Sequence, residues 1–209
     1  MTTPKRIRIL VADDHHVVRS GLAASLGLEE DFEIVGEAES GAQALALFPE
    51  TKPDVVLMDL RMADGGGIES TAALRARATD ARVIIYTTFD GDEDVYRAVQ
   101  AGARGYLLKS APRTELIAAI RAVAAGERYL PPELATRLAE RVSGPDVSER
   151  EIEVLRLISA GKSNKEIGAT LHIAEDTVKR HVSNILTKLG VSDRAQAATE
   201  AIRRGFLHF

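Results

Sequence analysis

The sequence predicts an α/β protein in two parts: a doubly wound, five-stranded parallel sheet within residues 5–125 and a small all-α domain of four helices within residues 147–209. Two observations predict the first part. Short apolar runs alternate five times with helical patterns, and the runs are almost continuous Val, Ile and Leu, as is typical of parallel strands covered on both faces. One observation predicts the second part: beyond residue 148 only helical patterns occur.

Five strands are expected in the first part, and a helix is expected after each of them. The strands are 7–11, 34–38, 55–58, 83–87 and 105–108. The helices are 15–26, 42–48, 69–78, 93–101 and 114–125. Repeated β/α units of this kind favour a doubly wound sheet with the flavodoxin-like strand order.

Residues 126–146 are expected to be a linker, because the alternating pattern stops there. The residues that interrupt it are Gly126, Pro131, Pro132, Gly144 and Pro145. Residues 133–142 lie between the prolines and can form one short helix, so the linker is expected to be partly helical.

Helix start and stop signals divide the last part into four helices. Two capping-box patterns begin the first two helices, Ser148 with Glu151 and Ser163 with Glu166. A third helix is expected over 175–189, with Gly190 as its C-terminal stop. Ser192 is expected to cap a fourth helix that ends near Gly205.

Composition limits the class of protein. A chain of 209 residues fits two domains, and the absence of Cys excludes disulfides, thiol nucleophiles and cysteine zinc sites. The first apolar run has five residues, which is too short for a signal peptide, and no stretch approaches the roughly 20 apolar residues of a membrane helix. We therefore expect a soluble, cytoplasmic protein with no membrane partner.

The charge distribution does not by itself indicate nucleic-acid binding. The net charge is −4, yet residues 146–209 hold ten Lys and Arg against nine Asp and Glu, a net +1. The remaining residues therefore carry −5. A DNA-binding function of the helical part must depend on where its cations lie and not on their sum.

Polar residues follow four of the expected strands and predict a pocket at one edge of the sheet. They are Asp13 with Asp14, Asp59, Thr87 and Lys109. In an open parallel sheet the ligand crevice lies outside the carboxyl ends of the strands, so these groups should converge. A lone Asp after a strand is usually a cap and a lone Lys is usually solvated, but all four at strand ends in one five-repeat unit favour a functional site.

The chemistry of this group suits a phosphoryl transfer. The carboxylate of Asp59 follows a buried strand and can attack phosphorus to form an acyl phosphate. Three neighbouring carboxylates repel one another unless a hard divalent cation lies between them, and Mg²⁺ is the natural choice. Thr87 can donate a hydrogen bond and Lys109 a positive charge to the phosphoryl group. His15 and His16 lie beside the pocket; they are either surface residues or, less readily, metal ligands or phosphodonors.

Residues 5–125 resemble the receiver domain of two-component response regulators, in the segments Val11–His15, Leu57–Leu60, Tyr86–Thr88 and Gly105–Lys109. The resemblance implies that Asp59 accepts phosphate from a sensor histidine kinase. It implies that Mg²⁺ is held by Asp14, Asp59 and the backbone carbonyl of Arg61, with Asp13 acting through water. It further implies a switch pair of Thr87 and Tyr106, in which the ring turns inward; Thr87 is assigned rather than Thr88 because it precedes Lys109 by 22 positions.

One departure from that family concerns the loop after the acceptor strand. Receiver domains usually have a Met-Pro pair there, whereas this chain has Met62-Ala63 followed by Asp64 and three glycines. Without proline the 63–67 loop is expected to be more flexible.

The helix expected over 175–189 has one apolar stripe and one polar face. Val178, Val182, Ile185 and Leu189 form the stripe, and Lys179, Arg180 and Ser183 lie off it. On pattern alone this is most often a solvated helix. A short helix before it and a tight turn between the two are, however, helix-turn-helix geometry.

Residues 147–207 resemble the LuxR-type helix-turn-helix domain, in the segments Ser148–Glu151, Gly161–Ile167, Thr177–Val182 and Lys188–Val191. The resemblance implies that Lys179, Arg180 and Ser183 face base edges and that Asn164, Lys165 and Thr177 contact backbone phosphates. It implies that the last helix carries a dimer contact. Ala174 stands where the family often has a serine N-cap.

Together the two parts resemble the NarL/FixJ class of response regulators. The resemblance implies a phosphorylation-controlled transcription regulator that binds double-stranded DNA, as a homodimer when phosphorylated. We expect a phosphoacceptor switch that can assist its own phosphorylation and dephosphorylation, and not an enzyme. An aspartyl-phosphate phosphatase is disfavoured because Arg61 stands where its second Asp would be. The other alternative is a regulator whose receiver is inert and whose tail works without phosphate.

Overall fold

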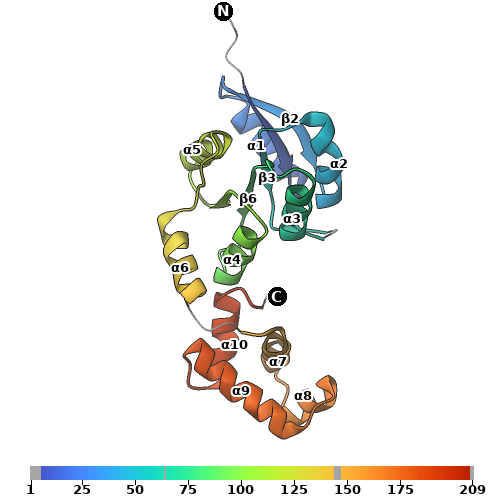
Figure 1. The fold of residues 1–209 in the computed structure, drawn as a ribbon, viewed down its shortest axis with the longest axis vertical. Helices are drawn as coiled ribbons and strands as arrows, with labels where there is room; N and C mark the ends of the chain where they lie inside the picture. The colour runs from blue at the N-terminus through green and yellow to red at the C-terminus, as the bar shows by residue number, and fades with distance from the viewer. Residues whose placement is uncertain (1–5, 64, 144–146, 208–209) are drawn as a thin grey trace, which may run out of the picture. The chain divides into compact units, whose positions relative to one another are not determined.

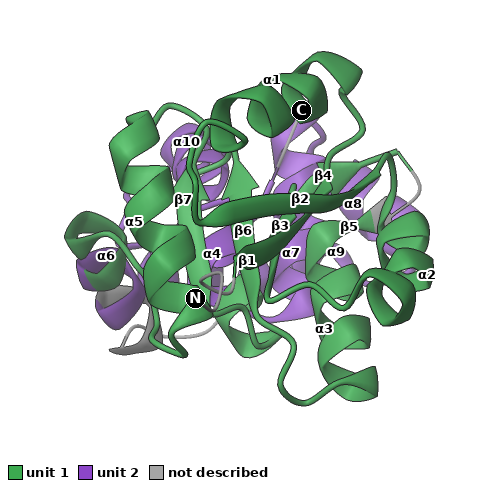
Figure 2. Ribbon diagram, turned by 90° about the horizontal axis from the view of Figure 1, so that it is seen from above, with its two compact units in different colours: residues 1–90, 97–135 green, residues 91–96, 136–209 purple. Residues whose placement is uncertain are grey.

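The computed structural model describes residues 6–63, 65–143 and 147–207 and divides the chain into two compact units. Figure 2 colours them: residues 1–90 with 97–135, and residues 91–96 with 136–209. The expected linker is therefore shared between the two units, with its first ten residues in one and the remainder in the other. The predicted domain boundaries remain a prediction.

The first unit is built around the predicted five-stranded parallel sheet, whose order is β2-β1-β3-β6-β7. This is the flavodoxin-like order, and the fold prediction is confirmed. The strands are β1 (Ile7–Ala12), β2 (Phe32–Ala38), β3 (Val55–Met58), β6 (Val83–Thr87) and β7 (Gly105–Leu108). The three central strands contain almost only buried apolar residues, because helices cover both faces.

Five helices follow these strands. They are α1 (His16–Leu26), α2 (Gly41–Thr51), α3 (Gly67–Arg77), α4 (Asp92–Gln100) and α5 (Arg113–Ala124). Side chains of α1 and α5 pack against alternate residues of the central strands, among them Val11, Leu57 and Ile84, in one apolar core. Helices α2 and α3 contact each other, and Figure 1 shows them side by side. This packing fixes the position of each strand end, so the residues that follow the strands are held in place by rigid elements.

Two segments of the first unit form strand pairings that were not predicted. Residues of the 63–67 loop take part in a small antiparallel ladder, in which β4 (Arg61–Met62) pairs with β5 (Gly65–Gly66). Asp64 lies outside the described residues. Tyr129, expected in the linker, pairs with the edge of β7: its N–H donates to Arg104 O and its carbonyl accepts from Tyr106 N–H at 3.1 Å.

The second unit contains α6 (Pro132–Ser143) in part and four helices of the C-terminal region: α7 (Glu149–Ser159), α8 (Asn164–Leu171), α9 (Glu175–Leu189) and α10 (Arg194–Arg203). Both predicted capping boxes are present, at Ser148 and at Ser163. The prediction that Ser192 caps the last helix is wrong, because Asp193 is the N-cap and its carboxylate accepts the N–H groups of Ala195 and Gln196. Both bonds go to Asp193 Oδ1, which thereby satisfies two of the free N–H groups of the first turn.

A buried ion pair joins two of these helices. Glu151 on α7 is only 3% exposed, and Lys188 on α9 donates to its carboxylate at 2.7 Å. The same carboxylate accepts the N–H of Ser148 at 2.8 Å. Burial raises the pKa of Glu151, but the bonds from Lys188 and Ser148 outweigh it, so the pKa lies below its ordinary value.

No helix in the described ranges 6–63, 65–143 and 147–207 is long and apolar enough to cross a membrane.

The lowered pKa of Glu151 predicts a pH-dependent contribution to stability. The ionised form is favoured in the folded state, so its contribution is complete above the ordinary pKa of 4.5 and is lost as the pH falls through the folded value. Glu151→Gln should cost about 2 kcal/mol of unfolding free energy at neutral pH. Below the folded pKa the difference from the wild-type chain should shrink. Urea unfolding followed by circular dichroism measures it.

Glu166→Gln is the matched control, since Glu166 occupies the same position in an exposed capping box. It should change stability less at every pH. A Glu151→Gln deficit that stays constant with pH would show that charge is not what stabilises this contact.

Candidate functional site

The groups predicted at the strand ends converge in the first unit. Backbone hydrogen bonds between neighbouring strand ends hold them: Asp59 N–H donates to Ala12 O at 2.8 Å, and Lys109 N–H donates to Thr87 O at 2.7 Å. The Lys109 ammonium lies 2.5 Å from Asp13 Oδ2 and 3.3 Å from Asp59 Oδ2. One cation therefore contacts carboxylates that follow two different strands, so these side chains lie together as expected.

Asp59 lies in the wall of an open cavity of about 550 Å³. The side chain is only 7% exposed. Burial, with a smaller contribution from the neighbouring Asp13 carboxylate, raises the pKa of Asp59, and Lys109 opposes that rise. Burial also lowers the pKa of Lys109, but the carboxylates of Asp13 and Asp59 outweigh it, so this pKa is raised. The pocket thus holds more negative charge than its one ammonium neutralises.

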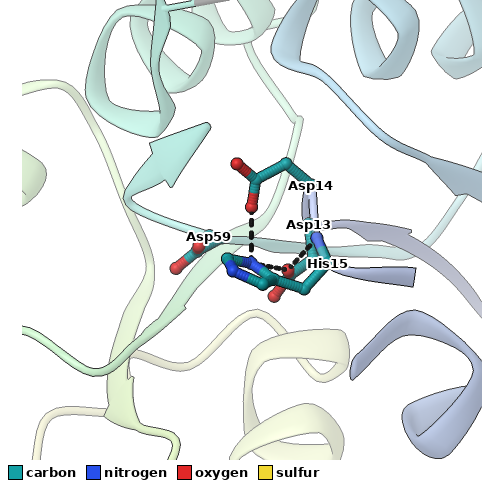
Figure 3. Close-up of side chains that lie close together, drawn as sticks. All are labelled: Asp13, Asp14, His15 and Asp59. Carbon is teal, nitrogen blue, oxygen red and sulfur yellow. Dashed lines mark hydrogen bonds and ion pairs between the residues drawn. The ribbon is translucent and has the colours of Figure 1, made fainter. Parts of the chain in front are cut away.

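The carboxylates fit a metal ion. One oxygen each from Asp13, Asp14 and Asp59 and a nitrogen of His15 lie within 4.8 Å of one another. Figure 3 shows these four side chains close together. Asp14 Oδ1 is buried without a well-formed hydrogen bond, so an oxygen of the site has coordination capacity to spare. Arg61, whose carbonyl is the other predicted ligand, lines the cavity beside Asp59 and Asp14.

Thr87, the last residue of β6, and Thr88, the residue after it, have different environments. Thr87 is fully buried, and its hydroxyl accepts the N–H of Phe89 at 3.3 Å. Thr88 lines the cavity. Tyr106 is 1% exposed, with its hydroxyl donating to Phe89 O at 2.7 Å, so its ring already lies inside. The switch assignment to Thr87 and Tyr106 stays a prediction.

Sequence reasoning missed the side-chain contacts of two arginines of this region. Arg19 is buried beside the apolar stripe of α1 and donates to Asp13 O at 2.7 Å, which fixes the first strand end. The guanidinium of Arg61 stacks 4.2 Å from the centre of the Phe89 ring, and both side chains line the cavity. The sequence held a signal for Arg19, because this charged residue lies next to the buried apolar face of α1 that contains Leu22 and Leu26. The stacking of Arg61 on Phe89 joins two segments that are distant in the sequence, so no local pattern shows it.

A close backbone approach explains one glycine of the 65–67 run. Gly67 begins α3, and its N–H donates to Leu60 O at 2.8 Å. A Cβ at this position would lie 1.9 Å from the carbonyl oxygen of Asp59. A Cβ at Gly66 would instead meet the flexible end of the Glu69 side chain. Of these two glycines, Gly67 is therefore the one required for the backbone of Asp59 to keep its place.

In the second unit, α8 and α9 form the predicted helix-turn-helix. His172 ends α8 in the left-handed conformation with φ 54°, and Ile173 N–H donates to Gly168 O at 3.0 Å. A Cβ at Gly168 would lie 2.7 Å from Ile173 O, so the turn packs directly on α8. Ala174 is the N-cap of α9 and makes no side-chain hydrogen bond there, as expected of a methyl side chain.

The predicted DNA-contacting residues lie on the surface of this motif. Lys165, Lys179, Arg180 and Ser183 are exposed, whereas Asn164 and Thr177 are partly buried. Val178, Ile185 and Leu189 are buried on the opposite side of α9, so the predicted division of its faces is confirmed. Lys179 contacts Asp176 at 3.0 Å and Glu175 at 3.5 Å. Asn164 Oδ1 is buried without a hydrogen bond.

If Asp59 accepts a phosphoryl group as predicted, Gly67→Ala should displace the backbone that carries Asp59 and lower the rate of that reaction by at least about tenfold, because reacting groups tolerate little misplacement. Gly66→Ala is the matched control and should stay close to the wild-type rate. Labelling by a radioactive small phosphodonor measures both. Equal rates in the two variants would show that the Gly67 contact does not position the acceptor.

Comparison with known proteins agrees with this geometry. The family model described as response regulator receiver domain matches residues 9–121, and that described as bacterial regulatory proteins, luxR family, matches residues 146–201. The transcriptional regulatory protein LiaR of Bacillus subtilis (strain 168) is 45% identical over 205 residues, covering 94% of this chain and 97% of LiaR. The response regulator VraR of Staphylococcus aureus is 40% identical over 206 residues, covering 96% and 99%.

Solved structures give the same result. The response regulator ChrA of a heme-sensing two-component system is 42% identical, with a TM-score of 0.57, over 97% of this chain and 99% of that one. RcsB from Salmonella enterica serovar Typhimurium, bound to promoter rprA with a phosphomimetic, is 27% identical with a TM-score of 0.69, over 93% and 98%. The chain belongs to the response regulators of two-component systems, and it is a transcription regulator that joins a receiver domain to a LuxR-type DNA-binding domain.

Proposed function

We propose that Asp59 is the phosphoacceptor of this regulator and that its phosphorylation controls DNA binding by the α8–α9 motif. The observation that carries the proposal is the position of the Lys109 ammonium. It lies within ion-pair distance of both Asp13 and Asp59, at the carboxyl ends of the strands. An in-line phosphoryl transfer depends on positioning and on charge neutralisation. The Lys109 ammonium beside the buried Asp59 carboxylate supplies both.

In the proposed reaction, an Asp59 carboxylate oxygen attacks the phosphorus of a phosphohistidine on the sensor kinase. The new O–P bond forms an acyl phosphate as the P–N bond breaks and the kinase histidine leaves. Lys109 is placed to neutralise part of the added negative charge. Asp13 and Asp14 are not phosphorylated in this reaction. Hydrolysis reverses the modification, because water attacks the phosphorus and releases inorganic phosphate from Asp59.

Mg²⁺ is the cofactor proposed for this pocket. Asp13, Asp14, Asp59 and the Arg61 carbonyl would hold it, and the ion would neutralise charge on the phosphoryl oxygens. The support is the set of converging oxygen ligands. Thr87 and Tyr106 are the proposed switch pair, linked through Phe89, whose N–H meets one hydroxyl and whose carbonyl meets the other.

The α9 surface is the proposed reader of DNA sequence. Arg180 and Lys179 can donate to guanine edges in the major groove, and Ser183 to either base type. Lys165, Asn164 and Thr177 are proposed to contact phosphates, which fix the motif on the duplex. The net charge of the C-terminal part is only +1, so one copy should bind weakly and a dimer on a two-fold-related site is proposed to bind tightly.

Asp59→Asn should abolish the effect of phosphorylation on DNA binding. Duplexes selected from random sequence should bind wild-type protein more tightly after treatment with acetyl phosphate and Mg²⁺. The variant should show one affinity with and without treatment, because the amide cannot accept the phosphoryl group. Fluorescence anisotropy measures the four affinities. A variant that responds as the wild-type chain does would overturn the assignment, and a wild-type chain indifferent to phosphate would favour an inert receiver.

Arg180→Ala should weaken binding to the selected duplex by about 1–3 kcal/mol and relax the preference for one base pair. Lys165→Ala should weaken all sequences alike and reduce the salt slope by about one. Arg156→Ala removes an exposed arginine of α7 and is the control, expected to change neither quantity. Titrations against a panel of single-base variants distinguish these results. An Arg180→Ala protein that keeps its base preference would remove this residue from sequence reading.

A further inference from the structure

The imidazole of His15 lies at the mouth of the acidic pocket and points into it. Its Nδ1 is 2.6 Å from Asp14 Oδ1 and 3.3 Å from Asp13 Oδ1. Figure 3 shows the ring between these two carboxylates. His15 is the N-cap of α1, but its side chain makes no cap hydrogen bond, and its backbone N–H donates to Asp13 Oδ1 at 2.9 Å. The backbone is therefore fixed, while the ring has no role in the helix.

The position of Nδ1 suits a ligand of the ion that the carboxylates would bind. The ligand atoms of Asp13, Asp14, His15 and Asp59 all lie within 4.8 Å of one another. Ligands on opposite sides of an ion with bonds of about 2.1 Å are about 4.2 Å apart, so small side-chain rotations would close the set. The His15 side chain is 68% exposed, which leaves the ring free to rotate.

The chemistry of an imidazole separates two classes of ion. Mg²⁺ prefers oxygen ligands, so Nδ1 adds little to its binding. Imidazole nitrogen is a good ligand for first-row transition ions, whose affinity rises along the series from Mn²⁺ through Co²⁺. His16, the next residue, offers a built-in comparison, since it is exposed and its Nε2 lies 3.5 Å from Ser20 Oγ.

We propose that His15 Nδ1 joins Asp13, Asp14 and Asp59 as a fourth ligand when a first-row transition ion enters the pocket. The phosphoacceptor site then binds such an ion more tightly than its carboxylates alone would. This inference rests on the proposed function, because the same carboxylates hold Mg²⁺ there. It adds a residue that discriminates between metals at the site of phosphorylation.

Calorimetric titration of the full chain with Co²⁺ and with Mg²⁺ tests the proposal. His15→Ala should lower Co²⁺ affinity by at least about tenfold, the lower end of what the loss of an outer-shell partner costs a metal site. The affinity for Mg²⁺ should stay unchanged or rise, since the ring no longer occupies the space between the carboxylates. His16→Ala is the control and should alter neither affinity.

A spectroscopic measurement identifies the ligand itself. With Mn²⁺ below one equivalent, the electron spin echo of the wild-type chain should show modulation from an imidazole nitrogen. That modulation should persist in His16→Ala and disappear in His15→Ala.

The results separate this inference from the proposed function. Asp14→Asn should weaken the binding of both metals. If it weakens neither, the pocket is not the metal site, and the Mg²⁺ proposal and this inference both fail, while the phosphoacceptor role of Asp59 is still decided by its own test. If Asp14→Asn weakens both but His15→Ala leaves Co²⁺ affinity and the nitrogen modulation intact, the metal site stands and the role of His15 is overturned.

Discussion

The contact of one lysine with two carboxylates is the interaction on which the site depends. Lys109 follows β7, Asp13 follows β1 and Asp59 follows β3, so the ion pairs exist only when three strands end at the same edge. The strand order β2-β1-β3-β6-β7 produces that arrangement, and the apolar central strands hold it in place. A single ammonium among three carboxylates leaves an excess of negative charge, which suits a site that takes up a cation.

The second unit uses charge differently. Glu151 is buried, but Lys188 and the capping box around Ser148 satisfy it, so its charge stabilises the packing of α7 against α9. Lys179 and Arg180 of α9 face outward, on the side opposite its buried Val178 and Leu189. The satisfied buried pair between Lys188 and Glu151 thus supports a helix with an exposed basic face. Lys179 must exchange its contacts with Asp176 and Glu175 for any contact to a base.

Local and repetitive signals predicted most of the fold. The capping boxes at Ser148 and Ser163 depend only on residues three apart, and both are present. The strand ends followed from five apolar runs and one topological rule. The polar residues after those runs could therefore be placed together without any three-dimensional information.

The missed features depend on contacts between distant segments. The β4–β5 ladder is accompanied by the close approach of Gly67 to the Asp59 carbonyl, which no pattern within 63–67 reveals. The pairing of Tyr129 with β7 joins the start of the expected linker to the sheet edge. Helix α2 continues through Pro49, where a proline would ordinarily end it. At the last helix the error was local: Ser192 and Asp193 are adjacent, and both can act as caps.

The most direct measurement is chemical mapping of the acyl phosphate. Borohydride reduces an aspartyl phosphate to homoserine, and peptide mass spectrometry after treatment with a phosphodonor and Mg²⁺ locates the reduced residue. The charge arrangement around Lys109 predicts one reduced position, Asp59. Reduction at Asp13 or Asp14, or at no residue of a chain whose DNA affinity still responds to the phosphodonor, would contradict it.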